Sequence, residues 1–404
     1  MAAIPTLRQL CRDVEESWLS SRAPHEMRWF RRRRGSLRIY GAVGLMADEQ
    51  GSDVSTAGSN TGATRAVRVT TAVAVGALVA TALGACSGDP GPKAVSSTST
   101  TATPTAAPTP SPTSTATNPL TGVGPPPHGP VIAVKVDDTA AGRPSMGLDQ
   151  ADVIYIEEVE GGLTRMVAVF ASAKPNVRAV RSIRSSDPEL LGQYGRITVV
   201  ASGGGRKAMQ VLDRSSLHSS INDRGQVGFS RDQSRPAPYN VVSDLAKVSA
   251  AIKADGVRNV GFTWAATDRR LAGATPAASV STRVGSTPVG FVWDAKQARY
   301  VRTVGGQRIL TSSGAQVAKP NVLVQFCQII PDRTDRDVNG NPTMYTKSVG
   351  SGRVVLFRGG RQIDGKWSRP SLGAPTRFTD TAGRPLLFAP GGAFVALVRP
   401  GAPA

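Results

Sequence analysis

The sequence predicts an α+β fold, with a mixed α/β N-terminal domain at residues 119–270 followed by a β-rich C-terminal domain at residues 271–404. Up to about Arg270, strand-length apolar runs alternate with runs of helical character. Beyond that point, short β segments are separated by glycine turns, as at Gly305 and Gly359. The length after residue 118 is sufficient for two domains of ordinary size.

Residues 46–85 have the anatomy of a lipoprotein signal peptide. Arg65 and Arg68 precede an uncharged apolar run at Val69–Leu83, and Gly84 and Ala85 then lead to Cys86. The run is shorter than the roughly 20 residues that a membrane span requires. We therefore expect cleavage before Cys86, lipidation of its thiol with palmitate-like acyl chains, and anchoring on the extracytoplasmic face of the cell membrane.

Residues 1–45 are interpreted as an over-extended translation start, because a start at Met46 leaves a signal peptide of ordinary length. The run Arg31–Arg34 would suit a twin-arginine export signal. Asp48 and Glu49, however, interrupt the path from that run to the apolar segment.

Residues 86–118 consist mostly of Ser, Thr, Pro and Ala after the cysteine. Such a composition buries too little apolar surface to fold, so we expect a disordered linker that reaches up to roughly 100 Å from the membrane. The same Ser, Thr and Pro content is compatible with O-glycosylation.

Within the folded part, apolar runs predict strands and amphipathic runs predict helices. The predicted strands are 131–136, 153–159, 163–170, 197–201, 322–330 and 393–398, and the predicted helices are 187–194, 206–213 and 243–254.

The chain is strongly basic, with 48 Lys and Arg against 29 Asp and Glu and a net charge of +19. The part that follows the signal peptide keeps +15. This balance favours attraction to an anionic cell-wall polymer or to lipid headgroups. Aromatic residues make up only 5% of the chain and are not interleaved with the basic ones, so we expect no nucleic-acid partner.

Cysteine and histidine are too scarce for a disulfide, a metal site or a recognisable cofactor site after the signal peptide. Cys327 is expected to be a small buried hydrophobic residue. His128 and His218 are the remaining histidines of that part. No nucleophile motif such as Gly-x-Ser-x-Gly or Ser-x-x-Lys is recognised, which favours a non-enzymatic protein and leaves catalysis open.

A set of short motifs runs through the chain after the linker. They are Arg143-Pro144 with Gly147-Leu148, Ala151–Tyr155, Val159–Arg165, Val180–Arg184, Asn321–Gln325 and Ala374–Phe378. As a set they resemble the motifs of the YerB-like bacterial lipoproteins, a family whose common domain has no established activity. The chain departs from the family pattern at Asp138, where Asn is typical, and at Tyr239, where His is typical. The resemblance implies an envelope lipoprotein and covers nearly everything after the linker.

Three carboxylates near predicted strand ends are candidate catalytic residues. Glu158 and Glu160 are two residues apart, so on a strand they would face one side about 7 Å from each other, with Asp137 near them. Such a pair would suit glycoside chemistry or a cation. The alternative is that Glu160-Gly161-Gly162 is a turn between strands with solvated acids.

A candidate anion site is predicted from arginines and a glycine loop. Arg181 and Arg184, with Arg165 and Glu160 near them, would grip a carboxylate or phosphate. The strand 197–201 leads into a loop with backbone N–H groups at a basic helix start. The alternatives are a plain tight turn for the loop and internal pairing of the arginines with Asp137 or Glu160. The loop residues are Ser202, Gly203, Gly204 and Gly205.

The segment from Asp335 to Gly340 fits the opening of a calcium loop, but Thr346 stands where a bidentate glutamate is needed. A glycine-rich turn is the better interpretation, and no metal site is expected. The combined prediction is a lipid-anchored binding or scaffold protein of the cell envelope. The alternatives are a carboxylate-based enzyme that modifies the cell wall and a structural partner of another envelope protein.

Overall fold

The computed structural model describes residues 117–337 and 339–404, which fall in one compact unit. The predictions for Cys86, the leader, the signal peptide and all but the end of the linker lie outside these residues. Most predicted elements are confirmed within a residue or two. The predicted strand 322–330 is wrong as a single strand, because β16 (Asn321–Phe326) ends before Cys327 and β17 (Ile329–Arg336) begins in a different sheet. The predicted helix 243–254 is shorter, because Asp244 ends a strand and accepts a hydrogen bond from the Lys247 backbone N–H at 3.0 Å, which caps the helix.

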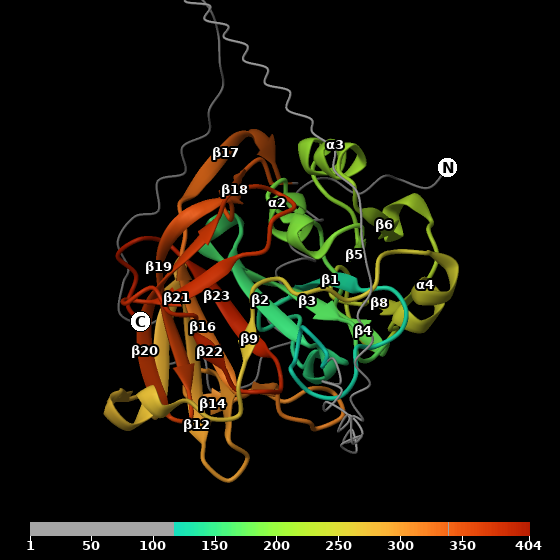
Figure 1. Cartoon of the computed structure of the whole chain (residues 1–404). Coiled ribbons are helices and arrows are strands. Elements are labelled where there is room, and N and C mark those ends of the chain that lie inside the picture. Colours follow the sequence, from blue (N-terminus) through green and yellow to red (C-terminus); the bar gives the residue numbers. More distant parts are fainter. Residues whose placement is uncertain (1–116, 338) are drawn as a thin grey trace, which may run out of the picture. The chain divides into compact units, whose positions relative to one another are not determined.

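A mixed sheet of eleven strands forms the centre of this unit (Figure 1). Parallel pairs join β16 to β23, β23 to β2, β1 to β5 and β5 to β6, and the other neighbours are antiparallel. The strand order is β10 (Thr275–Pro276), β20 (Arg361–Arg369), β19 (Gly350–Arg358), β16 (Asn321–Phe326), β23 (Ala393–Val398), β2 (Val153–Glu158), β3 (Thr164–Phe170), β1 (Ile132–Asp137), β5 (Thr198–Ala201) and β6 (His218–Ile221), with β21 (Arg377–Asp380) paired to β20.

In the part of the chain that the structure describes, smaller sheets and three α-helices pack around the central sheet. The helices are α2 (Asp187–Leu191), α3 (Arg206–Arg214) and α4 (Leu245–Ala251). The outer strands are β4 (Asn176–Arg178), β7 (Phe229–Arg231), β8 (Val241–Asp244), β9 (Thr263–Trp264), β11 (Ser279–Val284), β12 (Thr287–Asp294), β13 (Arg299–Val304), β14 (Gln307–Arg308), β15 (Ala318–Lys319), β17 (Ile329–Arg336), β18 (Pro342–Thr346) and β22 (Leu387–Phe388).

The expected mixture of strands and helices is confirmed, and the described α-helices all precede Arg270. Strands from both sides of residue 270 are hydrogen-bonded in the central sheet, where β23 lies between β2 and β16. The predicted domain boundary at that residue stays a prediction.

Alternating side chains of the central strands build an apolar layer on each face of the sheet. In β1, Ala133 packs into one layer, whereas Val134 and Val136 pack into the other. Cys327 is buried in the first layer, and burial raises the pKa of its thiol to about 12, which confirms that it is a buried hydrophobic residue.

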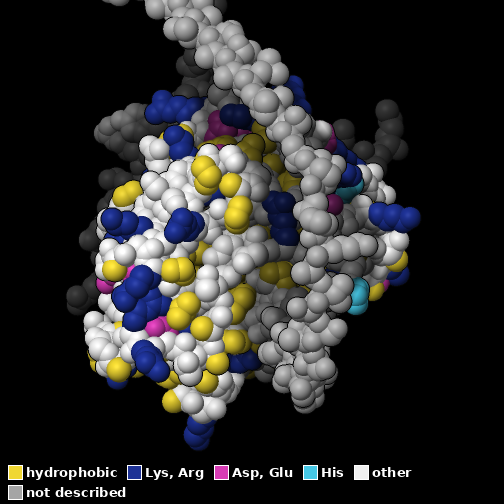
Figure 2. Space-filling view, viewed as in Figure 1, with side chains coloured by type: hydrophobic (Ala, Val, Ile, Leu, Met, Phe, Trp, Pro, Cys, Tyr) yellow, Lys and Arg dark blue, Asp and Glu magenta, His cyan; other side chains and the backbone are white. Residues whose placement is uncertain are grey.

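Lys and Arg side chains are distributed over the visible face of the molecule, and few Asp or Glu side chains reach it (Figure 2). Within the described residues, no helix is both long and apolar enough to cross a bilayer.

Candidate anion-binding site

A pocket of about 450 Å³ lies where β1 ends and β3 begins, and it brings the predicted arginines together with the glycine loop. Arg165 extends from β3, and Arg181 and Arg184 come from the irregular segment between β4 and α2. The lining residues are Arg165, Arg181, Ser182, Arg184, Ser202, Gly204, Gly205, Asn222, Asp223, Arg231, Ala237, Pro238, Val241, Arg336, Asp337, Asn339 and Thr343.

Arg181 and Arg184 are each paired with a buried carboxylate. Arg181 contacts Asp137 at the end of β1. Arg184 donates to both carboxylate oxygens of Glu160 through Nε and Nη2. The alternative of internal pairing is therefore confirmed for both arginines, and their guanidinium groups enter the pocket already held in place.

Arg165 differs from its neighbours because no carboxylate oxygen of the described residues lies within 4.0 Å of its guanidinium. In the strand register, Arg165 stands between Asp137 of β1 and Glu157 of β2. Its Nη1 donates only a long hydrogen bond, 3.4 Å, to the Ser182 carbonyl. Burial, reinforced by the like charges of Arg184 and Arg181, lowers the pKa of Arg165 to about 9. A negative ligand would relieve this unfavourable environment.

A buried charge cluster under the pocket fixes Arg184. Lys135 of β1 donates to both oxygens of Asp187 at 2.9 Å and contacts Glu157. Asp187 also accepts a 2.7 Å hydrogen bond from the Arg184 backbone N–H. Burial lowers the pKa of Lys135 to about 8, against the attraction of Asp187. Sequence reasoning missed this cluster, although a lysine within the apolar run of β1 was a usable signal.

The glycine loop forms one wall of the pocket by close backbone approach. The Ile183 N–H donates to the Gly203 carbonyl at 2.9 Å, and the Ser202 N–H donates to the Arg181 carbonyl at 3.0 Å. A Cβ on Gly203 would meet the carboxylate of Asp223. The loop therefore ties the arginine segment to β5 and to the start of α3, but Gly203 itself does not line the pocket.

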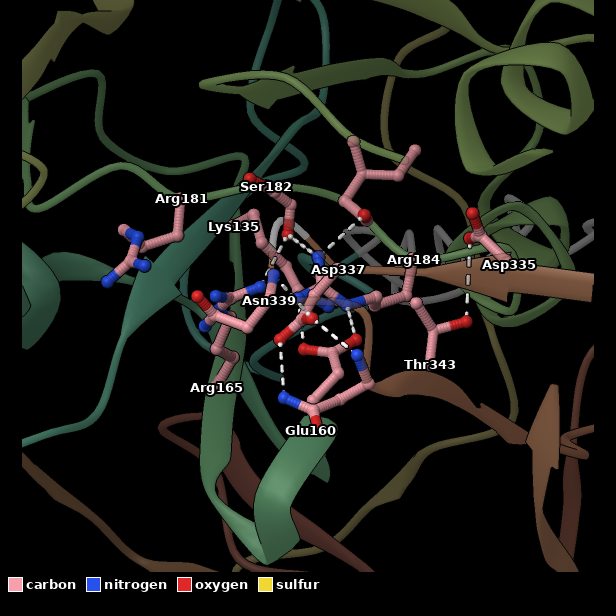
Figure 3. Close-up of polar contacts among 12 residues, drawn as sticks. Lys135, Glu160, Arg165, Arg181, Ser182, Arg184, Asp335, Asp337, Asn339 and Thr343 are labelled. Carbon is pink, nitrogen blue, oxygen red and sulfur yellow. Dashed lines mark hydrogen bonds and ion pairs between the residues drawn. The ribbon is translucent and has the colours of Figure 1, made fainter. Parts of the chain in front are cut away.

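The hairpin of β17 and β18 covers the pocket, and its turn places Asp337 and Asn339 between Arg165 and Arg184 (Figure 3). The predicted turn is thus confirmed. Burial acts to raise the pKa of Asp337, but hydrogen bonds from Asn341 and Asn339 and the charge of Arg184 hold it below its usual value. Sequence reasoning missed the position of this hairpin over the pocket, because a contact so distant along the chain leaves no local signal.

The candidate catalytic carboxylates are not assembled into one site. The expectation that Glu158 and Glu160 share a strand face is wrong, because β2 ends at Glu158 and Glu160 begins a short 3₁₀ turn. Glu158 is paired with Arg399 at 2.8 Å, whereas Glu160 and Asp137 hold the pocket arginines. The turn interpretation is confirmed, but both glutamates are buried rather than solvated.

Two family models match the described part of the chain. One, described as the N-terminal domain of a protein of unknown function (DUF3048), matches residues 120–258, and its C-terminal counterpart matches residues 279–395. A relative from Bacillus subtilis (strain 168), named "Putative lipoprotein YerB", is 25% identical over 247 residues, which cover 59% of this chain and 72% of the relative. The crystal structure of the YerB protein from Bacillus subtilis superposes with a TM-score of 0.59 at 21% identity, covering 70% of this chain and 96% of that one.

Proposed function

The chain belongs to the DUF3048 family, and we propose that it is a lipid-anchored protein of the bacterial cell envelope that binds an anionic group in the pocket around Arg165. The observation that carries the binding proposal is the half-buried Arg165 side chain, which lines the pocket and has no carboxylate partner among the described residues.

The geometry supports a carboxylate or phosphate as the bound group. Arg181 and Arg184 are oriented by their own carboxylates, so little conformational entropy is lost when a ligand binds beside them. Their carboxylates neutralise Arg181 and Arg184, whereas the positive charge of Arg165 has no carboxylate partner among the described residues and is available to an anion. A planar guanidinium donates two parallel hydrogen bonds to either kind of anion.

Replacement of Arg165 tests the binding proposal. We expect Arg165→Gln to weaken binding of inorganic phosphate by about tenfold or more, as measured by isothermal titration calorimetry, because a desolvated charge–charge contact is lost. The fold should survive, since no ion pair among the described residues is broken. Arg377→Gln, an exposed arginine on β21, removes the same charge elsewhere and should leave the affinity unchanged. Equal affinities in the two variants would refute the assignment.

The anchor proposal is supported by the apolar run that ends at Cys86 and by the lipoprotein description of the Bacillus relative. Cys86→Ala in the full chain should abolish incorporation of a labelled fatty acid and release the protein from the membrane fraction. Cys327→Ala changes a buried cysteine and should leave labelling intact. Persistent labelling of the Cys86 variant would contradict the anchor.

A further inference from the structure

A second, more basic cleft lies beside the arginine pocket. It has a volume of about 600 Å³ and runs between α3 and β17, which pack against each other. Its lining residues are Arg206, Lys207, Gln210, Val211, Arg214, Arg333, Thr334, Asp335 and Arg336.

The charges of this cleft are not balanced internally. Among the described residues, no carboxylate lies within ion-pair distance of four exposed arginines, which are Arg206, Arg214, Arg333 and Arg336. Lys207 is the exception, because it pairs with Asp332 at 2.7 Å. The acid in the lining, Asp335, is buried and cannot offset four guanidinium groups. Like charges gathered in this way repel one another, and a polyanion would relieve that repulsion.

The arginines form two rows along the cleft. Arg206 and Arg214 are eight residues apart on α3, a separation of about 12 Å along the helix axis. Arg333 and Arg336 are three residues apart on β17, about 10 Å along the strand. An extended ligand therefore meets positive charge on both sides over a length greater than that of a single phosphate.

The cleft and the pocket are adjacent. Arg336 lines both of them. Gly205 lines the pocket, and the next residue, Arg206, opens α3 and lines the cleft. An extended ligand with one anionic group beside Arg165 can thus continue between α3 and β17.

We propose that the cleft binds the continuation of a linear polymer with repeated phosphate groups, one of which occupies the pocket around Arg165. The inference rests on the proposed anion site and adds the class of ligand, a polymer rather than a single anion. Among the described residues, no aromatic side chain lines either cavity, and the half-buried Tyr239 ring beside the pocket is already covered by the Arg181 guanidinium at 5.1 Å. These residues therefore offer no free platform on which nucleic-acid bases stack. These residues recognise the repeated phosphate charges of the polymer and not a nucleic-acid base.

The test compares inorganic phosphate with a linear polyphosphate chain of about 15 units. The full protein should bind the polyphosphate at least about tenfold more tightly than inorganic phosphate, with a steep loss of affinity as salt is added. The double variant Arg206→Gln, Arg214→Gln should lose this gain and keep the phosphate affinity. The control Arg283→Gln, Arg377→Gln removes two exposed arginines from β11 and β21 and should keep both affinities.

The variants separate failure of the inference from failure of the proposed site. Arg165→Gln should weaken phosphate binding and polymer binding together. If it changes neither while the cleft variant still weakens the polymer, the pocket assignment fails and the cleft remains. Equal binding of chain and phosphate by the wild type, or tighter binding of a single-stranded oligonucleotide with as many phosphates, would overturn the proposed polymer.

Discussion

Arg184 and Arg224 make the same kind of bidentate pair in opposite environments. Arg184 and its partner Glu160 are both buried, with side chains 5% and 6% exposed. Arg224 and Asp213 lie at the surface, 37% and 50% exposed. Loss of a buried partner leaves an isolated charge in the interior, whereas an exposed carboxylate is rehydrated.

The two arginines therefore predict very different effects on stability. Arg184→Gln should lower the free energy of unfolding by about 3–5 kcal/mol, because Glu160 stays buried without its partner. Arg224→Gln should lower it by about 1 kcal/mol or less. Chemical denaturation of the two variants measures both quantities, and similar losses would show that the Glu160 pair is not desolvated.

Two buried lysines predict an unusual dependence of stability on pH. Burial lowers the pKa of Lys135 and of Lys319 to about 8, from about 10.5 in an unfolded chain. Between these values the unfolded state binds more protons, so the free energy of unfolding rises with pH, by about 1 kcal/mol or more for each lysine. Burial also raises the pKa of Tyr155 to about 12, so stability should fall again above pH 10.

Denaturation curves between pH 7.5 and 11 check this profile. Lys319→Met removes one of the two buried lysines, so the rise between pH 8 and 10 should be smaller than in the wild type. A wild-type stability that falls steadily over the same range would contradict the prediction.

At the residue scale, the sequence predicted which arginines line the pocket better than it predicted which carboxylates pair with them. Arg165, Arg181 and Arg184 were predicted together and they line one pocket. Which of the three arginines lacks a carboxylate partner depends on side-chain contacts between β1, β3 and the segment before α2. Residue spacing holds no information about such contacts.

The hairpin of β17 and β18 is the element that shapes the pocket opening. Its turn brings Asp337 against the arginines, where the carboxylate opposes an incoming anion. Glu189 of α2 holds the base of the hairpin, since it accepts hydrogen bonds from the Tyr345 hydroxyl at 2.7 Å and from the Ser348 N–H at 2.6 Å. The turn itself was predictable from its glycine and asparagine content, but its position over α3 and β3 was not.

Removal of the Asp337 charge should strengthen anion binding. We expect Asp337→Asn to raise the affinity for inorganic phosphate severalfold at low salt, and less at high salt where charges are screened. The amide oxygen still accepts the hydrogen bonds from Asn339 and Asn341, so the turn is retained. Asp364→Asn, an exposed acid on β20, is the charge-matched control, and an equal gain there would contradict a local effect.

At the scale of the whole molecule, the two predicted regions depend on each other. β2 pairs with β23 along one edge, and the buried Asp138 of the first region contacts Arg302 of the second at 3.0 Å. Local periodicity predicted most of these strands individually. Their neighbours in the sheet lie far apart in the sequence, and for that reason the single shared sheet was not predicted.

A fragment of residues 117–270 should therefore not fold alone, because β2 would expose an unpaired edge and Asp138 would lose a buried partner. Circular dichroism and limited proteolysis of the fragment test this, and co-expression with residues 271–404 should restore resistance to protease. A fragment that melts cooperatively by itself would instead establish two independent domains.

The position of β23 also sets the order in which the protein is completed. This strand lies within the last dozen residues of the chain and fills the gap between β2 and β16, which both precede it. Until it emerges, those strands have no common neighbour and the sheet remains in separate pieces. A chain whose last residues are still being synthesised therefore cannot complete its central sheet, however long the earlier strands have been available.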